Sequence, residues 1–195
     1  MGRERIQVYT DYKSPYAYVA NRALFALEET HDVELDWYPY ILRIEEYLGS
    51  LDERNAHQWR RVRYSYMDAR RMANQQGLTL YGPQRVFEGY HAAAGLLFAK
   101  AGGFFRPYHD LVFDRFFKRD LDIDDPQQMA EAVASAGGDR AAYLAYSEGP
   151  GRDAVDRVVA EAEEQGVFGV PTLVLRGELF WGSERIPLLI QRLEG

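Results

Sequence analysis

In the first forty residues, the spacing of apolar side chains changes from the two-residue period of a strand to the 3.6-residue period of a helix and back again. Ile6, Val8 and Thr10 alternate with Gln7 and Tyr9, the period of a half-buried strand. Residues 16–27 then place their apolar side chains on one helical stripe. Residues 33–37 alternate again and stop just before a proline, which predicts a second strand. Together these elements form a βαβ unit, which is parallel and right-handed by default.

The predicted first helix has a well-marked start. Ser14 occupies the N-cap position and Pro15 the first helical position, where its missing N–H costs nothing. On this pattern alone, Ser14 needs no role beyond capping a helix.

From about residue 41 to residue 165 the pattern is almost wholly helical. Gly and Pro residues separate the predicted helices. Residues 52–76 form the longest one, which is polar and Arg-rich with a sparse stripe of Trp59, Val62, Tyr66 and Met72. The other predicted helices span residues 91–101, 107–118, 126–136, 139–147 and 152–165.

Strand character returns only at the end of the chain. Residues 172–176 predict a strand, Gly177 and Glu178 a tight turn, and residues 179–181 the return strand. Ser183 is predicted to cap a last helix. The order β-α-β, helical block, β-β-α indicates a four-stranded α/β unit, residues 1–40 plus 166–195, with an all-helical insertion at 41–165.

Length, composition and charge exclude several classes. A chain of 195 residues, 47% hydrophobic, suits one domain or two small ones. No apolar run is long enough to cross a bilayer, and no apolar leader precedes the first strand, so we expect a cytoplasmic protein without a membrane partner. A net charge of −7 argues against nucleic-acid binding. The local basic cluster is interpreted as a solvated helix face; it contains Arg60, Arg61, Arg63, Arg70 and Arg71.

The sequence contains no cysteine, which removes disulfides, thiolate metal sites and cysteine nucleophiles together. Any thiol chemistry must therefore come from a bound small molecule. The four histidines do not have the spacing of a ligand set, so no metal site is expected. His91 opens a predicted helix and either lines a pocket or serves as a cap or core residue.

Four stretches carry a resemblance to a known family. They are the turn at Ser14-Pro15-Tyr16, YMDARRMANQQGLTLYGP at 66–83, GVFGVPTLVL at 166–175 and FWGSERIPLL at 180–189. They resemble the 2-hydroxychromene-2-carboxylate isomerases and the related kappa-class glutathione transferases. These families have a thioredoxin-like fold with a DsbA-like helical insertion. Residues 90–103 are more similar to DsbA-like oxidoreductases.

The resemblance implies glutathione as the cofactor. Ser14 stands where redox relatives place their first reactive cysteine, at a helix N-terminus that stabilises a thiolate, and its hydroxyl would donate to the glutathione sulfur. The resemblance also implies a cis bond between Val170 and Pro171, with the Val170 backbone pairing with the cysteinyl part of glutathione. The alternative is a trans proline entering an edge strand.

Four further residues acquire glutathione roles by resemblance. Ser183 and Glu184 would hold the γ-glutamyl end at a helix N-terminus, or form a plain cap with an acidic first turn. Arg61 would meet the glycyl carboxylate, and Asn55 would lie near the sulfur. Alternatively, Arg61 and Asn55 are solvated helix residues.

The implied activity is a glutathione-dependent isomerisation. The thiolate adds to an electron-poor carbon conjugated with a carbonyl, the temporarily single bond rotates, and elimination releases the isomer. The substrate would be a small aromatic or conjugated carbonyl compound, as in aromatic degradation. A kappa-like glutathione transferase and a cysteine-less DsbA-like binding protein without catalysis remain as alternatives, and a homodimer stays open.

Overall fold

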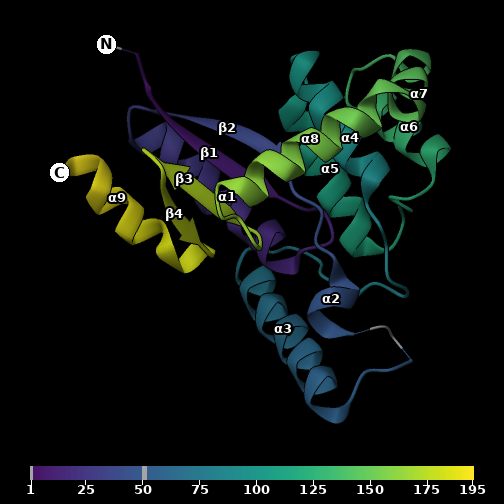
Figure 1. Ribbon diagram of the computed structural model, residues 1–195, viewed down its shortest axis with the longest axis horizontal. Coiled ribbons are helices and arrows are strands. Elements are labelled where there is room, and N and C mark those ends of the chain that lie inside the picture. Colours follow the sequence, from purple (N-terminus) through teal and green to yellow (C-terminus); the bar gives the residue numbers. More distant parts are fainter. Residues whose placement is uncertain (1, 50–51) are drawn as a thin grey trace.

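The central sheet is assembled from both ends of the chain (Figure 1). The computed structural model describes residues 2–49 and 52–195. It orders the strands β2 (Val33–Pro39), β1 (Glu4–Thr10), β3 (Thr172–Leu175) and β4 (Glu178–Trp181). β1 and β2 are parallel, whereas β3 is antiparallel to both β1 and β4. The predicted four-stranded α/β unit is therefore confirmed.

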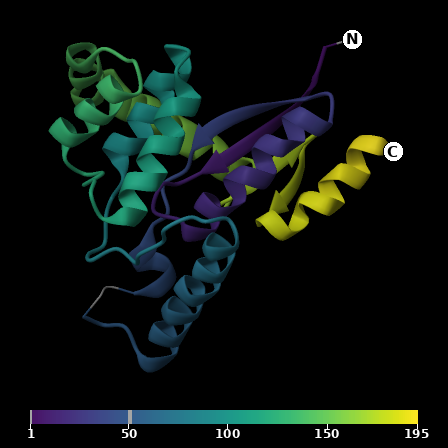
Figure 2. The same cartoon turned by 180° about the vertical axis from the view of Figure 1, so that it is seen from behind.

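Two helices cover one face of this sheet, α1 (Pro15–Thr30) and α9 (Ile186–Glu194) (Figure 2). Their apolar stripes are buried against inward-facing strand residues, because alternate strand side chains point to the same face. Leu24 of α1 and Leu189 of α9 share one buried cluster with Ile6, Val8 and Leu173. This packing holds the N-terminus of α1 at the end of β1.

The other face of the sheet meets the helical block. Tyr9 and Val174 belong to the buried cluster that also contains Ala93, Leu96 and Val159. The block consists of α4 (Tyr90–Ala101), α5 (Phe105–Lys118), α6 (Pro126–Ser135), α7 (Arg140–Glu148) and α8 (Pro150–Glu164). Each of these matches a predicted helix to within two residues at either end.

α2 (Ile44–Leu48) and α3 (Ala56–Gln75) lie at the lower end of the molecule, below the sheet in Figure 1. The prediction that the long helix begins at residue 52 is wrong. A capping box fixes the start at Ala56, because the Asn55 side chain accepts from the helix backbone and the Gln58 side chain accepts from Asn55 N–H.

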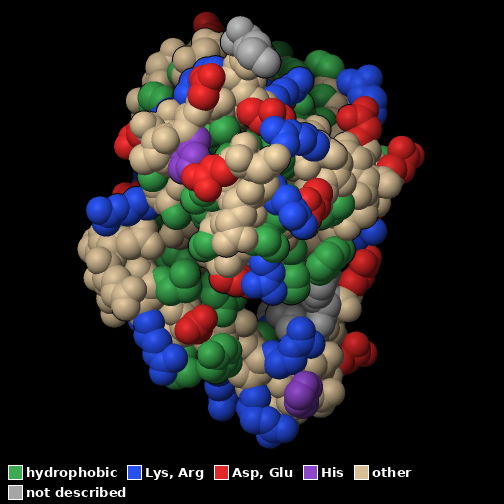
Figure 3. All heavy atoms as spheres, turned by 90° about the vertical axis from the view of Figure 1, so that its left-hand side faces the viewer, with side chains coloured by type: hydrophobic (Ala, Val, Ile, Leu, Met, Phe, Trp, Pro, Cys, Tyr) green, Lys and Arg blue, Asp and Glu red, His purple; other side chains and the backbone are tan. Residues whose placement is uncertain are grey.

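The basic cluster lies on α3 and is solvent-facing. Arg60, Arg61, Arg63, Arg70 and Arg71 are all exposed. Figure 3 shows Lys and Arg side chains gathered at this lower end of the molecule. The interpretation of a solvated helix face agrees with this exposure.

Two details near the C-terminus differ from prediction. The β3–β4 turn is formed by Arg176 and Gly177, both with positive φ (51° and 81°), and Glu178 already belongs to β4. Ser183 does not cap the last helix; it opens a short 3-10 helix, η1 (Ser183–Arg185). The reason is Pro187, which has no N–H to donate to Ser183 C=O, so Ile186 N–H bonds that carbonyl instead.

Candidate functional site

Ser14 lies at the end of the turn that connects β1 to α1, directly before the first residue of the helix. Its Oγ accepts a hydrogen bond from Ala17 N–H at 3.2 Å, and Pro15 follows in the first helical position. Asp11 C=O accepts from Ser14 N–H at 2.9 Å, which fixes the approach to the helix. The N-cap predicted from the sequence is confirmed, and Ser14 is only 4% exposed.

This corner leaves two hydrogen-bond donors unassigned. The Ser14 hydroxyl accepts from the helix, so its own proton remains available. Tyr16 N–H is one of the first N–H groups of α1, which lack partners within the helix. In the described part of the chain, neither donor has a recorded acceptor. Two donors at a positive helix end form an arrangement that favours an anion.

The predicted cis bond between Val170 and Pro171 is confirmed. Pro171 C=O accepts from Gly182 N–H at 2.9 Å, which ties the loop to the start of η1. Gly182 has φ 93°, a conformation open to glycine but not to most other residues. Among the described residues, no backbone partner is found for Val170 N–H or C=O. The Val170 peptide is thus available to pair with another backbone.

One cavity of about 610 Å³ lies between α1, α3 and the Pro171 loop. It brings together Val170, Pro171, Ser183 and Glu184, four of the residues predicted for one site. The remaining lining residues are Tyr16, Val19, Ala20, Ala23, Asp68, Met72, Gln76, Trp181 and Gly182. The first turns of α1, which Ser14 caps, form one wall, but Ser14 itself is not among the lining residues.

The described lining of this cavity contains two carboxylates, Asp68 and Glu184, and no Lys or Arg. The Tyr16 hydroxyl donates to Asp68 Oδ2 at 3.1 Å. Burial and this carboxylate raise the pKa of Tyr16 to about 12, so the phenol stays protonated. The acidic side of the cavity therefore suits an ammonium group, while the Ser14 corner suits an anion.

α3 contributes residues to the cavity that its predicted stripe only partly revealed. Met72 belonged to that stripe, but Asp68 and Gln76 did not enter the prediction. The three lie four residues apart, and Gln76, the C-cap residue just after α3, still has helical backbone angles, so all three share one face; that spacing is the signal that could have found them. Gln76 Nε2 donates to Val19 C=O at 2.9 Å and locks α3 to α1.

The structure does not bring Asn55 and Arg61 into this cavity. Asn55 is exposed, and its Oδ1 already accepts from His57 N–H and Gln58 N–H at the start of α3. Arg61 is exposed on the same helix. Their proposed contacts with glutathione stay predictions.

His91 and His109 lie in separate surroundings and do not form a common site. His91 lies in the first turn of α4 and outside the cavity lining, where its C=O accepts from Tyr143. His109 is fully buried between Tyr12 and Asn21, which makes it a core residue. Across residues 2–49 and 52–195, no group of three or more metal-binding side chains is assembled. No helix in these ranges is long and apolar enough to cross a bilayer.

Comparison with known families defines the class of protein. Residues 5–194 match the DsbA-like thioredoxin domain, and the chain therefore belongs to this family. Its relatives include the 2-hydroxychromene-2-carboxylate isomerase of Pseudomonas putida, 25% identical, with 94% of this chain and 91% of that protein covered. The isomerase of Pseudomonas sp. strain C18 is 26% identical, with 97% and 90% covered.

A solved structure of a 2-hydroxychromene-2-carboxylate isomerase superposes with a TM-score of 0.81 at 24% identity, covering 97% of this chain and 94% of that one. The cytosolic disulfide reductase DsbM of Pseudomonas aeruginosa, solved with GSH, has a TM-score of 0.66 at 17% identity, with 98% and 100% covered. Both superpositions support the DsbA-like thioredoxin fold.

Proposed function

We propose that this protein is a glutathione-dependent isomerase of the 2-hydroxychromene-2-carboxylate isomerase type. The observation that carries the proposal is the cavity of about 610 Å³ that joins the first turns of α1, the cis-proline loop and the Ser183–Glu184 turn. The full-length similarity to named isomerases supports the reaction class.

Glutathione fits the polarity of this cavity. Its ammonium group would lie against Glu184 and Asp68, and its cysteinyl backbone would pair with Val170. Its sulfur would then face the Ser14 corner, where the hydroxyl and Tyr16 N–H donate to the thiolate and lower the thiol pKa. The backbone N–H groups at η1 would receive the γ-glutamyl carboxylate.

The protein then provides orientation and charge stabilisation and forms no covalent bond itself. The glutathione sulfur forms a bond to a carbon conjugated with a carbonyl, and the electron pair moves onto the carbonyl oxygen. Rotation about the resulting single bond and expulsion of the thiolate restore the double bond in the other geometry. The thiolate is released unchanged and the electron pair returns to the double bond, so no oxidant or reductant is consumed.

A thermal shift with a matched ligand tests this proposal. Glutathione should raise the melting temperature through linkage to the folded state, and Cys-Gly, which lacks the γ-glutamyl group, should raise it far less. If saturating glutathione leaves the melting temperature unchanged while an unrelated peptide raises it, the protein is a peptide-binding protein instead.

One observation favours that second candidate. Phe168 and Trp181 are each about half exposed, and their rings lie 4.8 Å apart beside the Pro171 loop. β4, which carries Trp181, is an edge strand of the sheet. An exposed aromatic pair next to a strand edge suits an extended peptide.

A further inference from the structure

A separate cavity, of about 590 Å³, lies between α1 and α5. α1 presents Tyr18 and Arg22 to it, one helical turn apart, and α5 presents Asp110 and Asp114, again one turn apart. None of these four residues belongs to the described lining of the cavity beside the cis-proline loop. The cavity between α1 and α5 therefore combines hydrogen-bond donors on one helix with carboxylates on the other.

The Tyr18 hydroxyl is the group in this cavity that points to a ligand. Tyr18 is only 5% exposed, and its ring is stacked on Phe113 and Phe117, with centroids 5.4 and 5.1 Å away. Among the described residues, its buried hydroxyl has no hydrogen-bond partner. Such groups are uncommon in native structures, because a buried donor without an acceptor loses its hydration and gains nothing in return.

The carboxylates of α5 lie near this hydroxyl without satisfying it. Burial and then Asp114 raise the pKa of Tyr18 to about 12, so the phenol stays protonated, yet the two groups do not reach hydrogen-bond geometry. Asp114 Oδ2 accepts from Lys118 at 2.7 Å, and Asp110 Oδ2 accepts from Arg106 at 2.6 Å. In the described part of the chain, neither Oδ1 has a recorded donor, so each carboxylate keeps one oxygen for a ligand.

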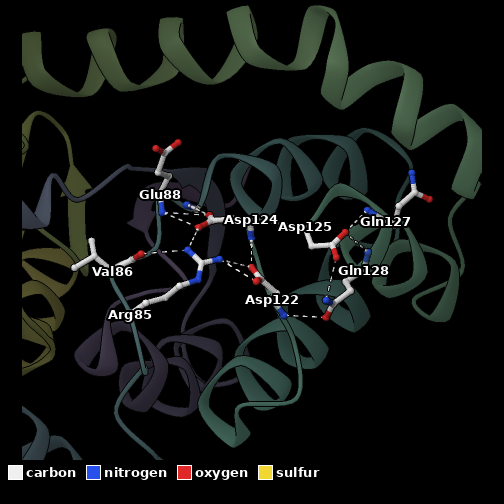
Figure 4. Close-up of polar contacts among 9 residues, drawn as sticks. Arg85, Val86, Glu88, Asp122, Asp124, Asp125, Gln127 and Gln128 are labelled. Atoms are coloured by element: carbon white, nitrogen blue, oxygen red, sulfur yellow. Dashed lines mark hydrogen bonds and ion pairs between the residues drawn. The ribbon is translucent and has the colours of Figure 1, made fainter.

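The acidic cluster before α6 shows the opposite case (Figure 4). Arg85 bonds both oxygens of Asp122 at 2.8 and 2.9 Å and Asp124 Oδ2 at 2.8 Å. Asp124 Oδ1 accepts from Gly89 N–H at 2.7 Å. All four carboxylate oxygens have donors from the chain itself, so that cluster needs no ligand.

The unassigned groups between α1 and α5 determine which charges a ligand must carry. An ammonium alone would bind Asp110 and Asp114 but leave the Tyr18 proton without an acceptor. An anion alone would accept that proton but would be repelled by the two carboxylates. A ligand that carries both charges close together satisfies both helices at once.

We propose that this cavity binds a small zwitterion with an α-amino carboxylate group, such as a free amino acid. The ammonium of the ligand lies between Asp110 and Asp114, and its carboxylate accepts from the Tyr18 hydroxyl and from Arg22. Leu78, which also lines the cavity, gives the ligand side chain an apolar surface. The site is independent of the proposed isomerase reaction and does not require glutathione.

Calorimetric titration with L-leucine and two analogues of single charge tests the site. 3-Methylbutylamine keeps only the ammonium, and 4-methylpentanoate keeps only the carboxylate. L-leucine should bind about tenfold more tightly than either analogue, because only L-leucine satisfies both helices. If either analogue binds as tightly as L-leucine, the proposal is overturned.

Two variants test the residues. Tyr18→Phe should weaken L-leucine binding about tenfold, and Asp114→Asn should do the same. Tyr18→Phe should not lower the melting temperature of the ligand-free protein, since the hydroxyl has no partner to lose. The matched controls are Tyr64→Phe, an exposed tyrosine on α3, and Asp120→Asn, which is paired with Arg115 outside the cavity; neither should change the affinity.

Glutathione separates this site from the proposed function, because its γ-glutamyl end also carries an α-amino carboxylate group. Saturating glutathione should leave the L-leucine affinity unchanged, and Tyr18→Phe should leave glutathione binding unchanged. If glutathione displaces L-leucine, or if Tyr18→Phe binds L-leucine as tightly as the parent, the proposal fails. It also fails if ligand-free Tyr18→Phe melts at a lower temperature than the parent, since the hydroxyl then has a partner within the protein. If L-leucine binds through Tyr18 while glutathione does not bind, the proposed function fails and this site stands.

Discussion

At the residue scale, the Ser14 hydroxyl is both an acceptor and a donor. As acceptor it caps α1 through Ala17 N–H, and in the proposed function it donates its own proton to the glutathione sulfur. Ser14→Ala removes the cap, which costs about 1 kcal/mol, a loss that a chain of this size tolerates. Two measurements separate these roles. The free energy of unfolding of Ser14→Ala measures the contribution of the cap, and the pKa of the bound glutathione thiol measures the contribution of the donor.

Tyr16 and Asp68 make a second residue-scale prediction. Burial and the Asp68 carboxylate hold the pKa of Tyr16 at about 12. Asp68→Asn removes the neighbouring charge, so the Tyr16 pKa should fall while glutathione binding weakens through loss of an ammonium partner. The Tyr16 titration is isolated as the ultraviolet difference between each protein and its Tyr16→Phe counterpart. If Asp68→Asn changes neither the Tyr16 pKa nor the glutathione affinity, Asp68 neither raises that pKa nor binds the ammonium group of glutathione.

At the element scale, α3 serves two cavities. Its N-terminal half presents Trp59, Val62 and Tyr66 to a cavity of about 280 Å³, and its C-terminal half presents Asp68 and Met72 to the cavity of about 610 Å³ beside the cis-proline loop. The sequence predicted the helix and its sparse stripe, but a helical period alone does not distinguish residues that pack in a core from residues that line a cavity.

Asn55 supports a prediction about this helix. Asn55→Ala should lower the free energy of unfolding by about 1 kcal/mol, because two helix N–H groups lose their acceptor. Asn55→Asp keeps that acceptor and should retain the stability. If Asn55→Asp is as stable as the parent yet binds glutathione more weakly, the side-chain amide is a ligand group after all, and the resemblance located it correctly.

At the scale of the whole molecule, the order of the strands and of every helix except the short α2 (Ile44–Leu48) follows from periodicity and from Gly, Pro and cap signals. The boundaries that differ have local causes, such as the capping box that starts α3 late and Pro187, which turns the predicted Ser183 cap into a 3-10 turn. Site residues brought together by tertiary packing, such as Tyr16 with Asp68, carry no sequence signal that joins them.

Stability of the whole fold should depend on pH through His109. Burial, with a smaller effect of Arg106, lowers its pKa from 6.5 to about 3. Below pH 6.5 the unfolded chain takes up a proton that the folded chain excludes, so this contribution is complete above pH 6.5 and is lost as the pH falls toward 3. The slope reaches about 1.4 kcal/mol per pH unit.

Urea unfolding of the parent and of His109→Gln between pH 4 and 7 measures this dependence. The variant should be less stable than the parent at neutral pH. Its free energy of unfolding should also fall less steeply as the pH is lowered, because it lacks the one proton that His109 takes up on unfolding. Identical slopes in both proteins would mean that other groups set the acid sensitivity.

The most direct test of the proposed function is the titration of the glutathione thiol in the complex, followed by ultraviolet absorbance of the thiolate. In the parent protein, the pKa of the bound thiol should lie below that of free glutathione, because Ser14 and Tyr16 N–H stabilise the thiolate. Ser14→Ala should raise this pKa and slow turnover. A bound thiol that titrates like free glutathione, or identically in parent and Ser14→Ala, would contradict the proposed role of the Ser14 corner.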